Sequence, residues 1–280
     1  MIDAQTKLYG VIGNPVRHSL SPVIHNGAFK RLGWNAVYLA FEVKHVERAL
    51  EGIRGLGLKG VSVTLPFKTE VIPFLDKIEG LAKKIGAVNT IVNREGKLVG
   101  FNTDCSGALE ALEEKMDLGG KRVVLLGAGG AGRAIGFGLK ERGCQLIIAN
   151  RSRDRGETLS RELKGYFIPM SSFVKMKAGE LQADVVINTT SLGMVPQERE
   201  TPIPKKLLRK GMVVMDIVYE PLQTKLLREA KEKGCLTING LEMFIRQGAT
   251  QFEIWTGRKP DLKQIRKDLY RALKKGGIEK

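Results

Sequence analysis

Apolar and polar stretches alternate along the first hundred residues. Apolar runs at 8–13, 36–43 and 60–65 each predict a strand. Apolar residues at helical spacing follow the first two runs, in the segments 22–33 and 45–57. Strands that alternate with helices favour parallel pairing, so this part of the chain predicts an α/β domain.

The pattern changes between residues 87 and 103. Two short apolar runs flank the turn "REGK" there and predict two adjacent strands. A helical pattern, "CSGALEALEEKM", begins after Asp104. We place a domain boundary beside Asp104, where the first pattern ends.

A second alternating region begins at residue 121. An apolar strand leads into a glycine-rich turn, a helix over 130–142 and another strand that ends at residue 150. Strands at 183–190 and 211–219 continue the pattern. This region therefore predicts a second α/β domain with parallel strands.

The glycine-rich turn has the spacing of a dinucleotide-binding loop. Gly127, Gly129 and Gly132 satisfy GxGxxG, directly after an apolar strand and at the start of a helix. Such glycines permit a tight turn and let the backbone approach a pyrophosphate at the helix N-terminus. An ordinary glycine-rich turn is the weaker interpretation, because the flanking strand and helix match the motif.

The end of the next strand indicates which dinucleotide binds. Asn150 lies 23 positions after Gly127, where an NAD site usually carries an acidic residue. A neutral residue followed by Arg151 suits NADP, because a guanidinium binds the additional phosphate with several donors. Arg153 and Arg155 are also consistent with the solvated start of a helix.

Two serines precede the first predicted helix, in the stretch "HSLSP". Ser21 before Pro22 predicts an N-cap, since proline is favoured at the first helical position. Ser19 has no such explanation. Residues two apart in extended chain point to the same side, so both hydroxyls are able to bind one carboxylate. On these residues alone, a capped helix in a polar loop is favoured over a binding site.

The bulk composition excludes several classes of protein. The 280 residues are 42% hydrophobic, enough for two domains with cores, and no apolar run reaches the ~20 residues of a membrane span. The N-terminus lacks a signal-peptide layout, which predicts a cytoplasmic protein. Three separated cysteines predict reduced thiols, and three histidines without ligand spacing predict no metal site.

The net charge of +16 does not by itself predict a nucleic-acid partner. The basic residues are spread along the chain and mixed with 30 acidic residues. No recognised nucleic-acid-binding motif occurs. We interpret the charge as favouring solubility and the capture of anionic small molecules.

Polar residues close several predicted strands of the first domain. Thr64, Lys68, Asn89 and Asp104 follow apolar runs, and Ser19 and Ser21 lie after the first strand. Lys68 alone also fits a surface lysine, and Asp104 alone fits a helix cap. Together they supply hydroxyls, an amide, a lysine and a carboxylate, which a polyhydroxylated carboxylic acid requires.

A series of motifs extends over nearly the whole chain. In order, they are "GNPVRHSLSPVIHN", "VTLPFK", "GAVNT", "GFNTD", "GAGGAGRA", "NRS", "NTTSLGM", "MDIVYEPLQTKLL" and "GLEMFIRQGA". This series resembles the shikimate dehydrogenase family over roughly residues 7–255. The resemblance implies an NADP-dependent oxidoreductase that reduces 3-dehydroshikimate to shikimate on the pathway to aromatic amino acids. It also favours a ligand role for Ser19 and Ser21.

The resemblance implies an α/β fold of two domains. Residues 1–103 and 240–280 would form a substrate-binding domain, to which the C-terminal helices return. Residues 104–239 would form a Rossmann-like NADP-binding domain. Ser62, Asn239 and Phe244 depart from the residues usual in the family.

The resemblance also implies the roles of individual residues. Lys68 and Asp104 would be the catalytic pair. The implied substrate-binding residues are Ser19, Ser21, Thr64, Lys68, Asn89, Asp104, Tyr219 and Gln247. The implied NADP(H)-binding residues are Gly127, Ala128, Gly129, Gly130, Ala131, Asn150, Arg151, Ser152, Arg153, Asp154, Arg155, Thr190, Ile217 and Gly240.

Other functions stay open at this point. One is a quinate/shikimate dehydrogenase with a broader range of substrates and cofactors. Another is a non-catalytic relative that binds the same ligands as a regulator, which the presence of both Lys68 and Asp104 disfavours. We expect a small-molecule substrate, no nucleic acid and no membrane, and the sequence leaves monomer and homodimer open.

Overall fold

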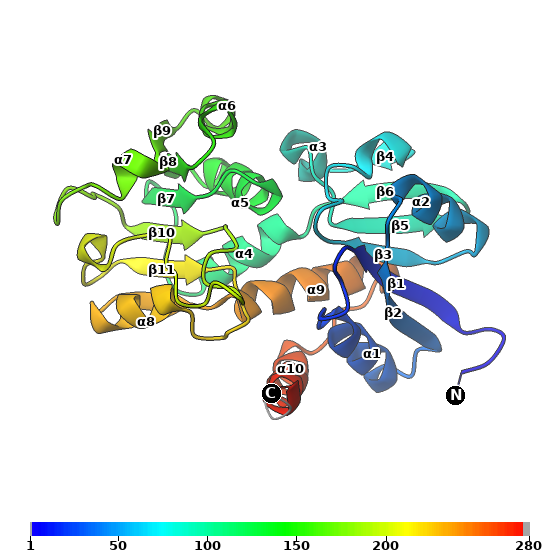
Figure 1. Ribbon diagram of the computed structural model, residues 1–280. Helices are drawn as coiled ribbons and strands as arrows, with labels where there is room; N and C mark the ends of the chain where they lie inside the picture. Colours follow the sequence, from blue (N-terminus) through cyan, green and yellow to red (C-terminus); the bar gives the residue numbers. More distant parts are fainter. Residues whose placement is uncertain (1, 277–280) are drawn as a thin grey trace. The chain divides into compact units, whose positions relative to one another are not determined.

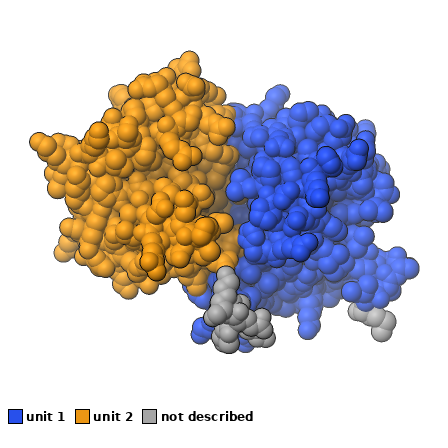
Figure 2. Space-filling model, viewed as in Figure 1, with its two compact units in different colours: residues 1–103, 245–280 blue, residues 104–244 orange. Residues whose placement is uncertain are grey.

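The computed structural model describes residues 2–276 and divides into two compact units (Figures 1 and 2). Unit 1 comprises residues 1–103 and 245–280, and unit 2 comprises residues 104–244. Each unit contains one six-stranded sheet.

The sheet of unit 1 is mixed. Its strands, in spatial order, are β2 (Ala36–Glu42), β1 (Lys7–Gly13), β3 (Gly60–Val63), β5 (Thr90–Arg94), β6 (Lys97–Phe101) and β4 (Lys77–Ile78). Strands β1, β2 and β3 are parallel, whereas β5 is antiparallel to both of its neighbours. The ends of β1, β3 and β6 therefore meet the start of β5 at one edge of the sheet.

Helices cover both faces of this sheet. They are α1 (Ser21–Arg31), α2 (Val46–Gly55), α3 (Leu81–Ile85), the 3₁₀ helix η1 (Ile72–Phe74), α9 (Gly240–Thr256, within unit 1 from residue 245) and α10 (Leu262–Gly276). Tyr9 packs with Phe29 of α1, whereas Ile12 lies in the cluster that contains Leu50 of α2. Alternate residues of β1 thus face opposite helical layers, as the pleat of a strand requires. Trp255 of α9 donates to the carbonyl of Ile91 at 3.0 Å, so the predicted return of the C-terminal helices is confirmed.

The sheet of unit 2 is entirely parallel. Its strands, in spatial order, are β12 (Leu236–Ile238), β11 (Val213–Asp216), β10 (Val185–Asn188), β7 (Arg122–Leu126), β8 (Gln145–Asn150) and β9 (Tyr166–Pro169). The chain starts at β7 in the middle, proceeds outward through β8 and β9, and then returns to β10 on the other side. This is the doubly wound order of dinucleotide-binding domains, whose ligands bind where the direction reverses.

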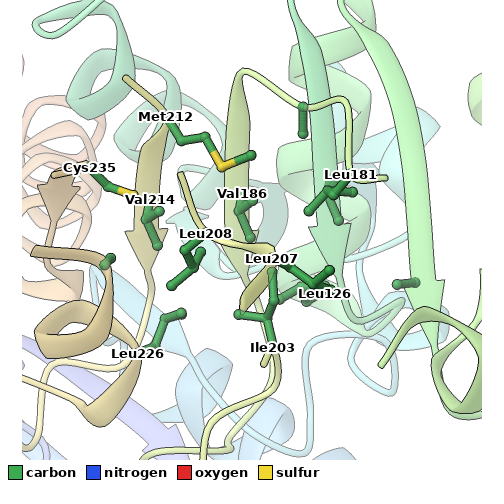
Figure 3. Packing of buried hydrophobic residues seen from close by; sticks show 14 of the residues in the cluster. Leu126, Leu181, Val186, Ile203, Leu207, Leu208, Met212, Val214, Leu226 and Cys235 are labelled. Atoms are coloured by element: carbon green, nitrogen blue, oxygen red, sulfur yellow. The ribbon is translucent and has the colours of Figure 1, made fainter. Parts of the chain in front are cut away.

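Helices and loops bury both faces of the second sheet. The helices are α4 (Asp104–Glu113), α5 (Gly130–Glu141), α6 (Arg153–Leu163), α7 (Met170–Phe173), the 3₁₀ helix η2 (Lys205–Leu207) and α8 (Lys225–Glu232). Figure 3 shows the cluster on one face, where Leu226 of α8 joins Val186 and Val214 of the sheet. Leu125 points to the other face, since it lies beside Gly136 of α5. Buried strand residues on both faces explain the continuous apolar runs of the sequence.

The segment after β11 enters a short helix only after a turn. Helix α8 begins at Lys225, because Thr224 caps it by accepting a hydrogen bond from the N–H of Leu227 at 3.3 Å. Strands β4, β9 and β12 have four residues or fewer and were not predicted. No helix within residues 2–276 is long and apolar enough to cross a membrane.

Candidate active site and cofactor site

Ser19 and Ser21 lie where the segment after β1 leads into α1, and the structure differs from the predicted helix cap there. Helix α1 starts at Ser21 itself, Leu20 occupies the N-cap position, and no side chain caps from there. The Ser19 hydroxyl instead accepts from the backbone N–H of Ser21 at 3.3 Å and donates to the Ser21 hydroxyl at 3.2 Å. The prediction that Ser21 is the N-cap is therefore wrong. The structure does bring the two hydroxyls together.

The loop after β3 presents Thr64 and Lys68. The N–H of Thr64 donates to the carbonyl of Ile12 at 3.0 Å, so the loop leaves the sheet beside the end of β1. The carbonyl of Lys68 accepts from the N–H of Val88 at 2.7 Å. Both Thr64 and Lys68 are half-buried. These bonds hold the loop next to the segment that leads into Asn89.

Asn89 lies just before β5 and is almost completely buried. Its side-chain oxygen accepts from the N–H of Thr103 at 2.8 Å and from the hydroxyl of Thr90 at 2.8 Å. Its amide nitrogen donates to Thr103 at 3.0 Å and, more weakly, to the Gln247 oxygen at 3.5 Å. The structure thus joins Asn89 and Gln247, which lie far apart in the sequence.

A further layer of polar side chains supports Asn89, and the sequence reasoning missed it. Gln251 of α9 donates to the carbonyl of Asn89 at 3.0 Å and to the hydroxyl of Thr90 at 2.9 Å. The Gln251 oxygen accepts from Ser62 at 2.8 Å, and Ser62 accepts from the Tyr38 hydroxyl at 2.6 Å. The available signal was the spacing of four between Gln247 and Gln251, which places both on one side of a helix.

Two candidate substrate residues belong to unit 2. Asp104 is the first residue of α4 and is buried. Tyr219 stacks on Phe244, with ring centroids 4.9 Å apart. Burial raises the pKa of Tyr219 to about 12, so its hydroxyl stays protonated at neutral pH.

The glycine-rich loop begins where β7 ends, beside β10. Gly127 has a φ of +107°, and a Cβ there would lie 2.8 Å from the Thr189 hydroxyl, so the position requires glycine. The N–H of Ala128 donates to the side-chain oxygen of Asn150 at 3.2 Å. The loop then enters α5 at Gly130. This conformation fits a dinucleotide, because the start of α5 directs backbone N–H groups toward a pyrophosphate.

The arginines after β8 have different surroundings. Arg153 forms an ion pair with Glu157 at 2.8 Å and lies 5.9 Å from the Phe167 ring centre. Arg151 is exposed at the end of β8, directly after Asn150. Arg151 is therefore the better candidate to bind a phosphate, while Arg153 already has partners. The remaining candidates of this segment are exposed, and they are Ser152, Asp154 and Arg155.

Thr190, Ile217 and Gly240 follow β10, β11 and β12, respectively. Parallel strands end at the same edge of a sheet, so these residues lie on the edge that carries the glycine-rich loop. A Cβ on Gly240 would lie 2.2 Å from the carbonyl of Ile217. The start of α9 is therefore packed directly on the turn after β11.

Comparisons with known proteins agree with this architecture. Family models match residues 11–91 (shikimate dehydrogenase substrate binding domain), 110–221 (shikimate / quinate 5-dehydrogenase) and 240–270 (shikimate 5'-dehydrogenase C-terminal domain). The NADP(+) shikimate dehydrogenase of Thermococcus kodakarensis is 49% identical over 93% of this chain and 95% of that protein.

Solved structures show the same fold. Shikimate 5-dehydrogenase of Thermus thermophilus, in complex with NADP(H) and shikimate, matches with a TM-score of 0.87 and 37% identity, over 95% of this chain and 100% of that one. Quinate dehydrogenase of Corynebacterium glutamicum, in complex with NAD, matches with a TM-score of 0.86 and 30% identity, over 95% and 99%. The chain belongs to the shikimate dehydrogenase family.

Proposed function

We propose that the chain catalyses the reversible, NADP-dependent reduction of 3-dehydroshikimate to shikimate. This oxidoreductase step lies on the chorismate route to aromatic amino acids. The observation that carries the proposal is the 49% identity to an NADP(+) shikimate dehydrogenase along nearly the full length of both chains. The catalytic and binding roles below are part of the proposal.

Unit 2 is proposed to hold the cofactor, which supplies a hydride when bound. Backbone N–H groups at the start of α5 would bind the pyrophosphate, and Arg151 would bind the 2′-phosphate. Thr190, Ile217 and Gly240 would line the nicotinamide end. The conformation of Gly127 supports this assignment, because a Cβ at that position would collide with the Thr189 hydroxyl and only glycine permits this tight turn.

Unit 1 is proposed to bind most of the substrate. Ser19 and Ser21 would donate hydrogen bonds to its carboxylate. The hydroxyl-binding residues would be Thr64, Asn89, Asp104, Tyr219 and Gln247. The contact between Ser19 and Ser21, and that between Asn89 and Gln247, support the assignment because each pair offers polar atoms at one place.

Lys68 is proposed to move the proton. Hydride addition to the ketone leaves an alkoxide, which requires a proton donor at that oxygen. The ammonium Nζ of Lys68 would donate this proton and, before doing so, stabilise the developing charge. In the reverse direction neutral Nζ would accept the proton from the substrate hydroxyl. Asp104 would orient the ammonium and bind substrate hydroxyls.

The proposal extends to the setting of the enzyme. Cys105, Cys144 and Cys235 are free thiols, and a reducing cytoplasm suits a protein that keeps them so. We propose small-molecule ligands and no nucleic-acid partner. Size-exclusion chromatography with light scattering would distinguish a monomer from a homodimer.

The decisive test is consumption of NADPH by the purified protein with 3-dehydroshikimate, with NADH and 3-dehydroquinate in parallel. Turnover mainly with NADPH and 3-dehydroshikimate is the expected result. Comparable turnover of 3-dehydroquinate or NADH would assign the enzyme to the broader quinate/shikimate group. The similarity to an NAD-bound quinate dehydrogenase is the reason to test this alternative. Binding of NADPH without any turnover would favour a regulatory relative.

A further inference from the structure

Asp216 is the last residue of β11 and is fully buried. Its Oδ1 accepts from the Asn188 amide at 2.9 Å and from the N–H of Val218 at 3.1 Å. Its Oδ2 accepts from the hydroxyl of Thr224 at 2.7 Å. All three donors are neutral, so hydrogen bonds alone compensate the burial of this carboxylate.

The first donor connects Asp216 to the loop after β10. Asn188 is aligned with Asp216 in the parallel ladder, and its amide also donates to the carbonyl of Leu192 at 3.1 Å. The side-chain oxygen of Asn188 accepts from the N–H of Thr190 at 3.0 Å and from its hydroxyl at 2.7 Å. Asp216 thereby fixes the amide that shapes residues 190–192.

The second donor connects Asp216 to the turn after β11. Val218, whose N–H reaches the carboxylate, lies between Ile217 and Tyr219. Gly240 contacts the same turn through the carbonyl of Ile217. The turn is thus held by the carboxylate and by the start of α9.

We propose that Asp216 is a positioning residue for the nicotinamide end of the cofactor site. It acts through Thr190 on one loop and through Ile217 and Tyr219 on the other, and its own buried oxygens are occupied. This inference rests on the proposed function, because those three residues are assigned to the cofactor and substrate there. Asp216 plays no part in binding the adenosine end, which lies with Arg151 and the glycine-rich loop.

The test compares two probes of the same site. NADPH reaches both ends of it, whereas adenosine 2′,5′-bisphosphate reaches only the adenosine end. We expect Asp216→Ala to weaken NADPH binding roughly tenfold and to leave bisphosphate binding unchanged, because three hydrogen bonds to the carboxylate are lost. Asp216→Asn should restore NADPH binding, since its oxygen accepts the same two N–H groups and its amide faces the Thr224 hydroxyl.

Two further variants keep the test decisive. Asn188→Ala removes the connection to the loop after β10 and should reproduce the selective loss of NADPH, even if Asp216→Ala fails to fold. Thr224→Val removes the bond from Thr224 to Asp216 and the cap that the same hydroxyl provides for α8, so it should lower the melting temperature without altering the ratio of the two affinities. Equal weakening of both probes in Asp216→Ala and Asn188→Ala, or the selective loss in Thr224→Val, would overturn the inference. A wild-type protein that binds neither probe would instead contradict the proposed function.

Discussion

His25 of unit 1 and Asp216 of unit 2 are both fully buried near proposed ligand residues, and the two side chains have opposite surroundings. His25 of unit 1 packs against Tyr38 and Trp255, and neither ring nitrogen has a hydrogen-bond partner among residues 2–276. Asp216 of unit 2 accepts three hydrogen bonds. An unpartnered base is easily kept neutral in an aromatic core, whereas a buried carboxylate needs donors.

The pKa values follow from this difference. Burial lowers the pKa of His25 to about 3. Burial raises the pKa of Asp216 to about 6, against the opposing effect of Thr224, Val218 and Asn188. At neutral pH the hydrogen-bonded network of unit 1, which consists of Tyr38, Ser62, Asn89, Thr90 and Gln251, is uncharged. The network of unit 2 contains the carboxylate of Asp216. The chain thus supports one set of ligand loops with neutral side chains and the other with a buried charge.

The largest expected effect is a loss of turnover, without a loss of cofactor binding, when the proposed proton donor of unit 1 is removed. Lys68→Ala should lower kcat about 10³-fold, because the alkoxide loses its proton donor. The dissociation constant of NADPH should stay the same, since that ligand is assigned to unit 2. Steady-state kinetics and a fluorescence titration measure the two quantities. Lys97→Ala, which removes an exposed lysine of β6, is the control. Near-normal kcat in Lys68→Ala would refute the assignment of proton transfer.

The next largest effect concerns the affinity of unit 2 for its cofactor. Arg151→Ala should weaken NADPH binding roughly 100-fold and NADH binding less than about threefold, because the charge-assisted bonds reach only the 2′-phosphate. Arg161→Ala removes another exposed arginine, on α6, and serves as the matched control. Equal weakening of both cofactors would show that Arg151 binds something other than this phosphate.

The sequence anticipated local elements better than their connections. The strand, glycine turn and helix from residue 122 to 141 were predicted because apolar runs and glycines act over a few residues. The parallel strands of unit 1 were also expected, but the reversed direction of β5 followed only from the hairpin. Ser21 was wrongly predicted as a cap. The N–H groups of Val23 and Ile24, which such a cap would bind, donate instead to the carbonyl of Leu20 at 3.0 and 3.4 Å.

The supporting networks were not anticipated at all. Tyr38, Ser62 and Gln251 come from three separate segments, and no spacing in the sequence indicates that they meet. Asp216 did leave a signal, since an acidic residue interrupts the apolar run 213–218. A carboxylate in such a position predicts donors around it. Candidate ligand residues were found through motifs, whereas the residues that position them required coordinates.

Acid should affect the two units in opposite directions. Between pH 6.5 and 3 the unfolded state binds a proton at His25 that the folded state does not, so unit 1 loses about 1.4 kcal/mol of stability per pH unit of acidification. Between pH 6 and 3.8 the folded state binds the additional proton, at Asp216, so the stability of unit 2 increases as pH falls.

The two units carry separate probes for this measurement. Both tryptophans, Trp34 and Trp255, belong to unit 1, and the three cysteines belong to unit 2. Urea unfolding at pH 8 and pH 5 should therefore be followed by fluorescence and by labelling with 4,4′-dithiodipyridine, which reacts in weak acid. His25→Phe should be about 2 kcal/mol more stable than wild type at pH 5, relative to pH 8, in the fluorescence signal. An unchanged pH dependence in His25→Phe would contradict the low pKa.

The smallest expected effect tests whether the uncharged network of unit 1 affects substrate binding without affecting cofactor binding. Gln251→Leu removes donors to Asn89 and Thr90 and the acceptor of Ser62, so it should raise KM for shikimate roughly tenfold. Thr250→Val, whose hydroxyl donates to the carbonyl of Arg246, is the neighbouring control. The ratio of KM values between Gln251→Leu and wild type should be constant from pH 7 to pH 9.

That constancy follows from the groups in the network. Burial raises the pKa of Tyr38 above its usual range, and His25 titrates near pH 3, so neither changes charge between pH 7 and pH 9. A ratio that varies over this range would require a charged group within the network of unit 1. A change in NADPH affinity would show that Gln251 also acts on the cofactor side. Either result would remove the distinction between a neutral support for the substrate and a charged support for the cofactor.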